Sequence, residues 1–213
     1  MGVRKITNKG VKRVIGKFPS LKMRRLICWE SQIERDYIYL LEFDPAVVSY
    51  AEQPLRISYH LDGKERHYTP DFLVKRVDKN LIVEVKQVEE AQKEEKQRLF
   101  RIASAICARD NYEFVVVTDT MIRVQPRLDN IKLLTRYQRI PIHDPQYQII
   151  CYELFSKCSE VRFSEVVQFF ASRNIGKQVV FSLLYWGILT VDLTQPITAE
   201  SGMSFPGCES DER

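Results

Sequence analysis

Histidine and paired cysteine are scarce in this chain, which limits the kinds of metal site that it can build. Its 213 residues include three histidines and five cysteines, and no two cysteines have Cys-x-x-Cys spacing. Structural zinc sites need closely spaced cysteine and histidine ligands, so a zinc centre is not expected. Unpaired cysteines in an odd number are typical of free thiols in a reducing compartment.

Long apolar runs are also absent from the sequence. No stretch approaches the roughly 20 apolar residues of a membrane span, and the first residues lack the apolar region of a signal peptide. Hydrophobic residues make up 45% of the chain and charged residues 28%, as in ordinary soluble globular proteins. We therefore expect a cytoplasmic protein without a membrane partner, large enough for one large domain or two small ones.

Acidic residues are missing from the first 29 residues, which carry nine lysines and arginines. The net charge of +4 decides little, but its uneven distribution is informative. We interpret residues 1–30 as a basic arm that is partly ordered against the body. Such an arm suits a polyanion such as nucleic acid, and it is equally compatible with a soluble, disordered tail.

A stretch in the first half of the chain combines apolar runs with isolated charges. Two runs rich in Val, Leu, Ile and Phe, Phe72–Val77 and Leu81–Val85, flank a polar turn and predict a hairpin. Side chains alternate between faces along a strand, so Glu84 and Lys86 share one face. Asp71 begins the neighbouring strand and could approach Glu84 across the hairpin. Two carboxylates and a lysine would then meet at one edge of a sheet.

These three side chains are of the kind that handles phosphate chemistry. Carboxylate oxygens are the ligands that magnesium prefers, and a lysine can orient a water or stabilise charge that develops on phosphate. Pro70-Asp71 before one strand and Glu84-Val85-Lys86 inside the next resemble the PD-(D/E)xK nuclease signature. An isolated ExK triplet has no diagnostic value, but this placement favours a nuclease site over an exposed hairpin with solvated charges.

A helix is predicted to begin after Ser31 and to end before Asp44-Pro45. Glu34 follows Ser31 at capping-box spacing, which would engage its carboxylate with backbone N–H groups. Glu34 also shares a helical stripe with apolar residues, which would aim it toward the sheet. The pattern alone leaves both interpretations open.

The order of landmarks from about Trp29 to Gln87 is more specific than the nuclease signature. The succession SxxExxxxxxLEFDPxVVSYxEQPLRIxY…YTPDFLV…VEVK resembles TnsA, the endonuclease subunit of bacterial heteromeric cut-and-paste transposases, with a looser resemblance to about Thr118. Some family members have glutamine where this chain has Glu84, which adds a potential ligand here. Gln53 is interpreted as part of a structural turn, because an amide is a poor ligand for a hard metal.

The resemblance implies the roles of the site residues. The catalytic residues would be Glu34, Asp71, Glu84 and Lys86, and the metal ligands would be Glu34, Asp71 and Glu84. The implied cofactor is magnesium, with manganese as an alternative.

The predicted fold class is α/β. Residues 31–140 are expected to form a restriction-endonuclease-like mixed sheet flanked by helices, together with a connector. A second hairpin with an Asp62-Gly63 turn, a long helix at Glu89–Arg109 and a strand at Glu113–Thr118 complete this domain.

Residues 145–200 are expected to form a small winged-helix-like domain, and residues 201–213 a tail. The predicted helices of this domain are Gln146–Lys157, Ser164–Ser172 and Lys177–Trp186. A two-stranded wing follows, with Ile188–Leu193 as its first strand and Met203–Phe205, at the start of the tail, as its second. The third helix has one cationic side chain, and it presents few of the Arg, Lys, Asn or Gln side chains that usually contact base edges. This favours protein docking over base readout.

The resemblance implies a metal-dependent DNA endonuclease that hydrolyses the 5′ sides of transposon ends during transposition. The implied partners are double-stranded transposon-end DNA, a DDE-type transposase that cuts the 3′ sides and an ATP-dependent regulator of target choice, in the bacterial cytoplasm. Two alternatives remain at this point: a restriction or repair endonuclease of the same superfamily, and a non-catalytic assembly adaptor.

Overall fold

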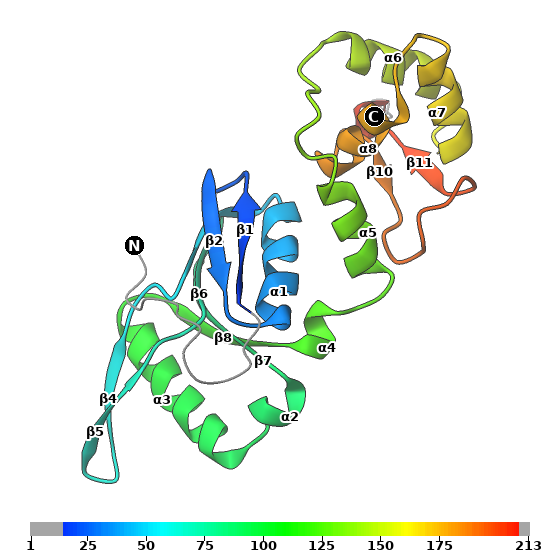
Figure 1. Ribbon diagram of the computed structural model, residues 1–213. Helices are drawn as coiled ribbons and strands as arrows, with labels where there is room; N and C mark the ends of the chain where they lie inside the picture. Colours follow the sequence, from blue (N-terminus) through cyan, green and yellow to red (C-terminus); the bar gives the residue numbers. More distant parts are fainter. Residues whose placement is uncertain (1–14, 209–213) are drawn as a thin grey trace, which may run out of the picture. The chain divides into compact units, whose positions relative to one another are not determined.

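The computed structural model describes residues 15–208. The chain forms two compact units that divide between Val124 and Gln125 (Figure 1). The sequence predicts a connector that reaches residue 140, whereas its helix α5 (Arg127–Thr135) lies in the second unit. Within the described residues, no helix is both long enough and apolar enough to cross a membrane.

A four-stranded mixed sheet forms the centre of the first unit, in the order β3-β6-β7-β8. Its strands are β3 (Val47–Glu52), β6 (Phe72–Arg76), β7 (Asn80–Lys86) and β8 (Glu113–Thr118). Neighbouring strands are antiparallel except β7 and β8, which are parallel. A parallel pair needs a crossover, and α2 (Val88–Ala91) with α3 (Glu94–Arg109) provides it. This mixed sheet flanked by helices is compatible with a nuclease fold.

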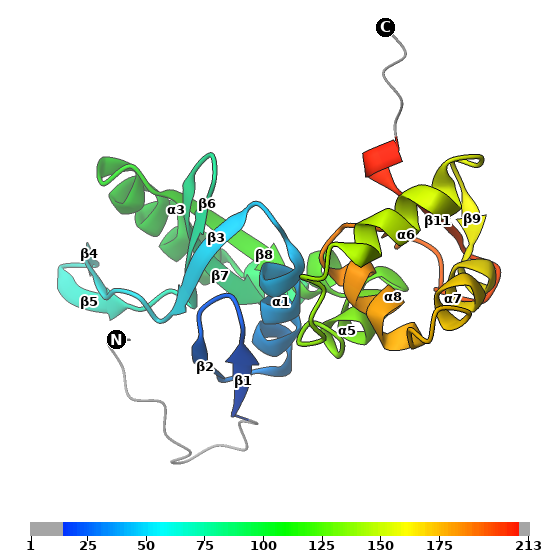
Figure 2. The ribbon, with the colours of Figure 1, turned by 90° about the horizontal axis from the view of Figure 1, so that it is seen from above.

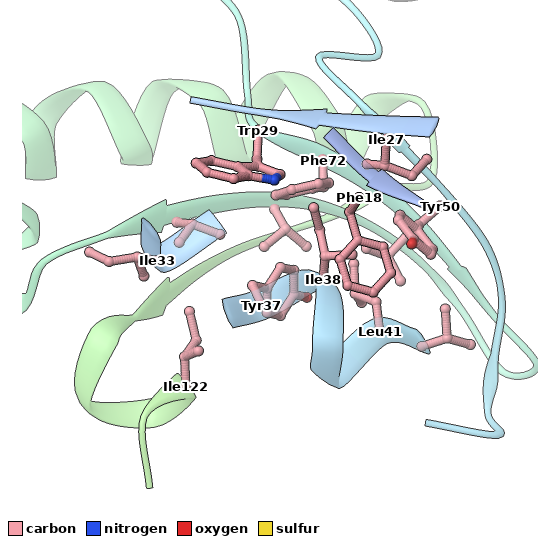
Figure 3. Close-up of a cluster of buried hydrophobic side chains, with 14 of the residues drawn as sticks. Phe18, Ile27, Trp29, Ile33, Tyr37, Ile38, Leu41, Tyr50, Phe72 and Ile122 are labelled. Atoms are coloured by element: carbon pink, nitrogen blue, oxygen red, sulfur yellow. The ribbon is translucent and has the colours of Figure 1, made fainter. Parts of the chain in front are cut away.

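One face of the sheet packs against α1 (Gln32–Phe43) and an N-terminal hairpin. The hairpin pairs β1 (Gly16–Ser20) with β2 (Arg25–Trp29), so this part of the predicted arm is ordered against the body as a pair of strands, and residues 1–14 lie outside the described part. Figure 3 shows side chains of the hairpin, of α1 and of β6 meeting in this core. Its buried members include Phe18, Ile27, Trp29, Ile38 and Phe72.

The other face packs against α3. Ala103 and Cys107 of this helix are buried with Ile57 and Ile82. The predicted helix from Glu89 to Arg109 is divided, because α2 ends at Ala91 and α3 begins at Glu94. A short helix, α4 (Asp119–Ile122), follows β8 and ends the unit.

Strands β4 (Ile57–Leu61) and β5 (Lys64–Tyr68) form a separate two-stranded ribbon. Asp62 and Gly63 connect them with φ values of 52° and 71°. Two consecutive positive φ values match the twist of a tight hairpin turn, which is why an Asp-Gly pair predicts this turn. Figures 1 and 2 show the ribbon extending away from the sheet at the side of α3.

The second unit combines helices with a small antiparallel sheet of order β10-β11-β9. After α5 it contains α6 (Gln146–Phe155), β9 (Val161–Arg162), α7 (Phe163–Ala171), α8 (Lys177–Tyr185), β10 (Thr190–Val191), β11 (Gly202–Ser204) and a 3-10 turn (Pro206–Cys208). Strand β9 is absent from the sequence prediction.

The start of the predicted tail is part of this sheet. Strand β11 pairs with both β10 and β9, and its Met203 is fully buried. Residues 201–208 are therefore ordered parts of the second unit, while residues 209–213 lie outside the described part. Asn130 of α5 donates hydrogen bonds to the carbonyl groups of Leu193 and Gln195, which ties this helix to the same unit.

Candidate active site

Asp71, Glu84 and Lys86 meet at one end of the antiparallel pair β6 and β7. The register aligns Phe72 with Val83, which places Asp71 opposite Glu84 at the end of the ladder. Lys86 Nζ lies 2.6 Å from Glu84 Oε1 and 3.5 Å from Asp71 Oδ2. The Val85 N–H donates to Asp71 Oδ2 at 2.8 Å, which holds this carboxylate across the hairpin. The structure therefore brings together three of the four predicted site residues in direct contact.

Glu34 lies at the start of α1, in the wall of the same cavity. Its Oε2 accepts the Glu30 N–H at 2.7 Å and its Oε1 accepts the Ser31 hydroxyl at 2.9 Å. In return, Ser31 Oγ accepts the Glu34 N–H at 3.2 Å, so the two side chains cap the helix in an arrangement close to a capping box, with the Glu30 N–H in place of the Ser31 N–H. The cavity measures about 610 Å³ and is lined by Glu34 together with Asp71, Glu84 and Lys86. Glu34 thus caps the helix and also faces the cavity, so the two interpretations of this residue are compatible.

Two carboxyl groups of the cavity, those of Asp71 and Glu34, are difficult to ionise. Burial and then the nearby Glu84 charge raise the pKa of Asp71 to about 7. Burial and then the Asp71 charge raise the pKa of Glu34 to about 7. Burial would lower the pKa of Lys86, but the Asp71 and Glu84 carboxylates outweigh it and raise this pKa. A cation between these oxygens relieves the repulsion, and Lys86 supplies one in this arrangement.

The donor chemistry of the cavity fits a hard divalent cation. Asp71 and Glu84 offer carboxylate oxygens that share one cationic partner, and Glu34 adds a third carboxylate to the wall. In the arrangement of residues 15–208, however, no three His, Cys, Asp or Glu side chains form a group that could hold a metal. Both Glu34 oxygens accept hydrogen bonds at the start of α1, one from the Glu30 N–H and one from the Ser31 hydroxyl.

Tyr68 is a site residue that the sequence analysis misses. Its hydroxyl donates to Glu84 Oε2 at 2.5 Å, while Lys86 contacts the other oxygen of the same carboxylate. Glu84 is only 4% exposed in its side chain, so these two contacts fix its orientation. Tyr68 ends β5, and its contact with Glu84 depends on how the ribbon meets the sheet. Strand periodicity does not contain that information.

Gln53 connects the two sides of the cavity. Its backbone N–H donates to the Asp71 carbonyl at 2.8 Å, and its Nε2 donates to Glu30 Oε1 at 3.1 Å. Its φ of 43° places it in the left-handed region, as expected for a residue in a tight turn. Its Oε1 is buried without a hydrogen-bond partner in the described structure. These contacts support the interpretation of Gln53 as a structural turn residue that also borders the site.

A mixed sheet flanked by helices, with two acids and a lysine gathered at the end of two of its strands, is compatible with a nuclease-like α/β domain. Residues 44–119 match the protein family described as TnsA-like endonuclease N terminal. This segment is therefore similar to the N-terminal domain of TnsA-like endonucleases, the family that the ordered landmarks indicate. The matched segment contains Asp71, Glu84 and Lys86, while Glu34 precedes it. A search of curated proteins finds no match to the chain.

Proposed function

We propose that this chain is the metal-dependent DNA endonuclease subunit of a cut-and-paste transposase, and that it hydrolyses the 5′ sides of transposon ends. The observation that carries this proposal is the Asp71–Lys86–Glu84 cluster within a TnsA-like endonuclease domain. The family supports a nuclease role in transposition, and the cluster supplies the chemistry that such a role needs.

Asp71 and Glu84 would hold magnesium, or manganese in its place, and Glu34 would complete or support that site. When bound, such an ion lowers the pKa of a water and neutralises charge on the phosphate that is attacked. The surrounding residues hold the ligands in place: the Val85 N–H fixes Asp71, and the Tyr68 hydroxyl fixes Glu84. Lys86, which contacts both carboxylates, is the residue that orients the attacking water or stabilises developing phosphate charge.

The second unit is proposed to be a winged-helix-like domain that docks partner proteins. Its α6, α7 and α8 with a three-stranded antiparallel sheet follow the element order of such domains. The residues of α8 from Val179 to Tyr185 are all buried, which leaves little of this helix to read base edges. The proposed protein partners are a DDE-type transposase that cuts the 3′ sides and an ATP-dependent regulator of target choice, in the bacterial cytoplasm.

Strand-resolved mapping of cuts on transposon-end DNA, with the partner proteins present, tests this proposal. Asp71→Ala and Lys86→Ala should retain 3′ cleavage and lose 5′ cleavage, because each removes one member of the cluster. Asp78→Ala and Lys79→Ala are matched controls in the turn at the opposite end of the β6–β7 hairpin. Reactions that contain either control should show both the 5′ and the 3′ cleavage.

Each rival function predicts a different result. A non-catalytic adaptor predicts that Asp71→Ala leaves all cleavage intact. A restriction or repair endonuclease predicts sequence- or structure-specific cutting by the isolated chain. Loss of cleavage on both strands in a folded Asp71→Ala protein contradicts the division of labour between the two subunits.

A further inference from the structure

The β4–β5 ribbon is poorly explained as a part of the folded core. In the described structure, β4 and β5 pair with each other and with no strand of the central sheet. Of the residues in these two strands, only Ile57 is buried. A two-stranded hairpin that buries so little apolar surface adds little to stability. Its extension beyond the sheet therefore calls for a role at the surface (Figures 1 and 2).

One face of the ribbon has the chemistry of a phosphate-binding surface. The register pairs Tyr59 with Arg66 and Leu61 with Lys64, and these four residues form what we name the ribbon face. Arg66 and Lys64 are exposed, and an aromatic and an aliphatic side chain lie beside them. Arginine and lysine beside apolar side chains are typical of surfaces that contact nucleic-acid backbones.

The acids of the ribbon lie away from this face. Glu65 pairs with His60, and side-chain alternation places both on the opposite face. Asp62, in the turn, accepts a hydrogen bond from Arg98 of α3 at 3.1 Å, which partly neutralises it. The positive charge of the ribbon face is therefore not cancelled by acids on the same face of the two strands.

The root of the ribbon is joined directly to the candidate active site. Tyr68, the last residue of β5, donates its hydroxyl to Glu84, and two residues separate it from Asp71. At about 3.3 Å per extended residue, the root lies within roughly 10 Å of the Asp71 backbone, and each five-residue strand spans about 17 Å. That span corresponds to about five nucleotides of one DNA strand, at about 3.4 Å each.

We propose that the ribbon face binds the phosphate backbone of duplex DNA next to the bond that is cut, and so directs the duplex into the cavity. This inference rests on the proposed endonuclease function and adds a surface that positions the substrate. Lys64 and Arg66 make the phosphate contacts, and Tyr59 and Leu61 pack against the sugar edges between them.

Equilibrium binding of the full chain to a short duplex, without divalent cation and over a range of salt concentrations, tests the inference. Each lost phosphate contact lowers the slope of log affinity against log salt by about 0.9, so Lys64→Gln/Arg66→Gln should lower it by about 1.8. The same relation predicts that at about 0.1 M salt this double variant binds the duplex on the order of 60-fold more weakly than the wild type. Lys75→Gln/Lys79→Gln removes the same charge at the far end of the β6–β7 hairpin and should bind like the wild type.

A charge-preserving variant separates phosphate binding from folding. Lys64→Arg/Arg66→Lys should retain the wild-type slope, and thermal unfolding should be unchanged in all three double variants. If Lys64→Gln/Arg66→Gln binds as tightly as the Lys75→Gln/Lys79→Gln control, the inference is overturned and the proposed nuclease function stands. If the wild type shows no salt-dependent DNA binding, both the inference and the proposed function are overturned.

Discussion

Lys86 should stabilise the metal-free protein chiefly by separating two carboxylates. Lys86→Met keeps most of the apolar stem and removes the ammonium that contacts Asp71 and Glu84. Breaking a buried ion pair by removing one partner typically costs 3–5 kcal/mol. Because the Lys86 side chain is 29% exposed, we expect the lower end of that range, about 3 kcal/mol at about pH 8.

The loss should depend strongly on pH. The Asp71 carboxyl has a pKa of about 7 with Lys86 present, and Lys86 lowers that pKa, so its removal should raise it further. Because the folded-state pKa of Asp71 lies above the unfolded value of about 3.9, the folded protein binds more protons than the unfolded protein at pH values between these two pKa values. The free energy of unfolding then falls as pH rises through this window, by up to about 1.4 kcal/mol per pH unit for one group. At about pH 5.5 Asp71 is protonated, its repulsion with Glu84 disappears, and Lys86→Met should cost less than about 1 kcal/mol.

Urea unfolding in the presence of a chelator measures this difference. Trp29 is buried in the core of the first unit, whereas Trp186 lies in the second unit and is 52% exposed. In a Trp186→Phe background, fluorescence therefore reports on the unit that contains the site. Lys75→Met, at an exposed position of β6, is the control and should have little effect at either pH. An equal loss at both pH values, or no loss at about pH 8, would refute the electrostatic reasoning.

Three further substitutions test other contacts. Tyr68→Phe should lower the free energy of unfolding by about 1.5–3 kcal/mol and weaken stabilisation by magnesium, because it leaves Glu84 Oε2 without its hydroxyl donor. Tyr59→Phe is the control, and equal effects of the two substitutions on thermal unfolding would contradict this role. Burial would raise the pKa of Glu52, but hydrogen bonds from Arg25 outweigh it and lower this pKa. The stabilisation from the Arg25–Glu52 pair is therefore present above the unfolded pKa of Glu52 and is lost as pH falls through its folded pKa. Arg25→Gln should lower the free energy of urea unfolding by about 1 kcal/mol at about pH 6 and by less at about pH 3.5, and equal losses at the two pH values would count against this pair. Phe170→Ala should destabilise the second unit by about 3–5 kcal/mol, measured through the tryptophan at the end of α8, and a loss below about 1 kcal/mol would contradict the tight packing of this side chain.

The hairpin that carries the site could be predicted because strand geometry determines it locally. Alternation along β7 places Glu84 and Lys86 on one face, and the antiparallel register then brings Asp71 opposite Glu84. The spacing of Ser31 and Glu34 likewise predicts that these two residues cap α1 together, and the structure contains reciprocal hydrogen bonds between them. Each of these relations depends on residues that are neighbours in sequence or across one tight turn.

The N-terminal hairpin could not be predicted, because long-range packing stabilises it. Its apolar residues are scattered among cations without a clear period, so its sequence resembles a basic arm. In the structure, Phe18 and Trp29 are buried against α1 and the sheet. The turn of this hairpin is held by Glu42 of α1, which accepts hydrogen bonds from the Ser20 hydroxyl and from the Tyr50 hydroxyl. The carboxylate that holds Ser20 therefore lies 22 positions from it along the chain, beyond the reach of a local pattern.

The same distinction explains why the acids of the site could be predicted while the residues that support them could not. A cluster of buried carboxylates is unfavourable by itself, as the raised pKa values of Asp71 and Glu34 show. It persists because backbone and hydroxyl donors hold it, among them the Val85 N–H and the Tyr68 hydroxyl at the end of the ribbon. Local sequence motifs identify the charged residues of the cluster. The hydrogen-bond donors that stabilise these charges can come from any element that the fold places beside them. Supporting residues such as Tyr68 must therefore be found from the structure.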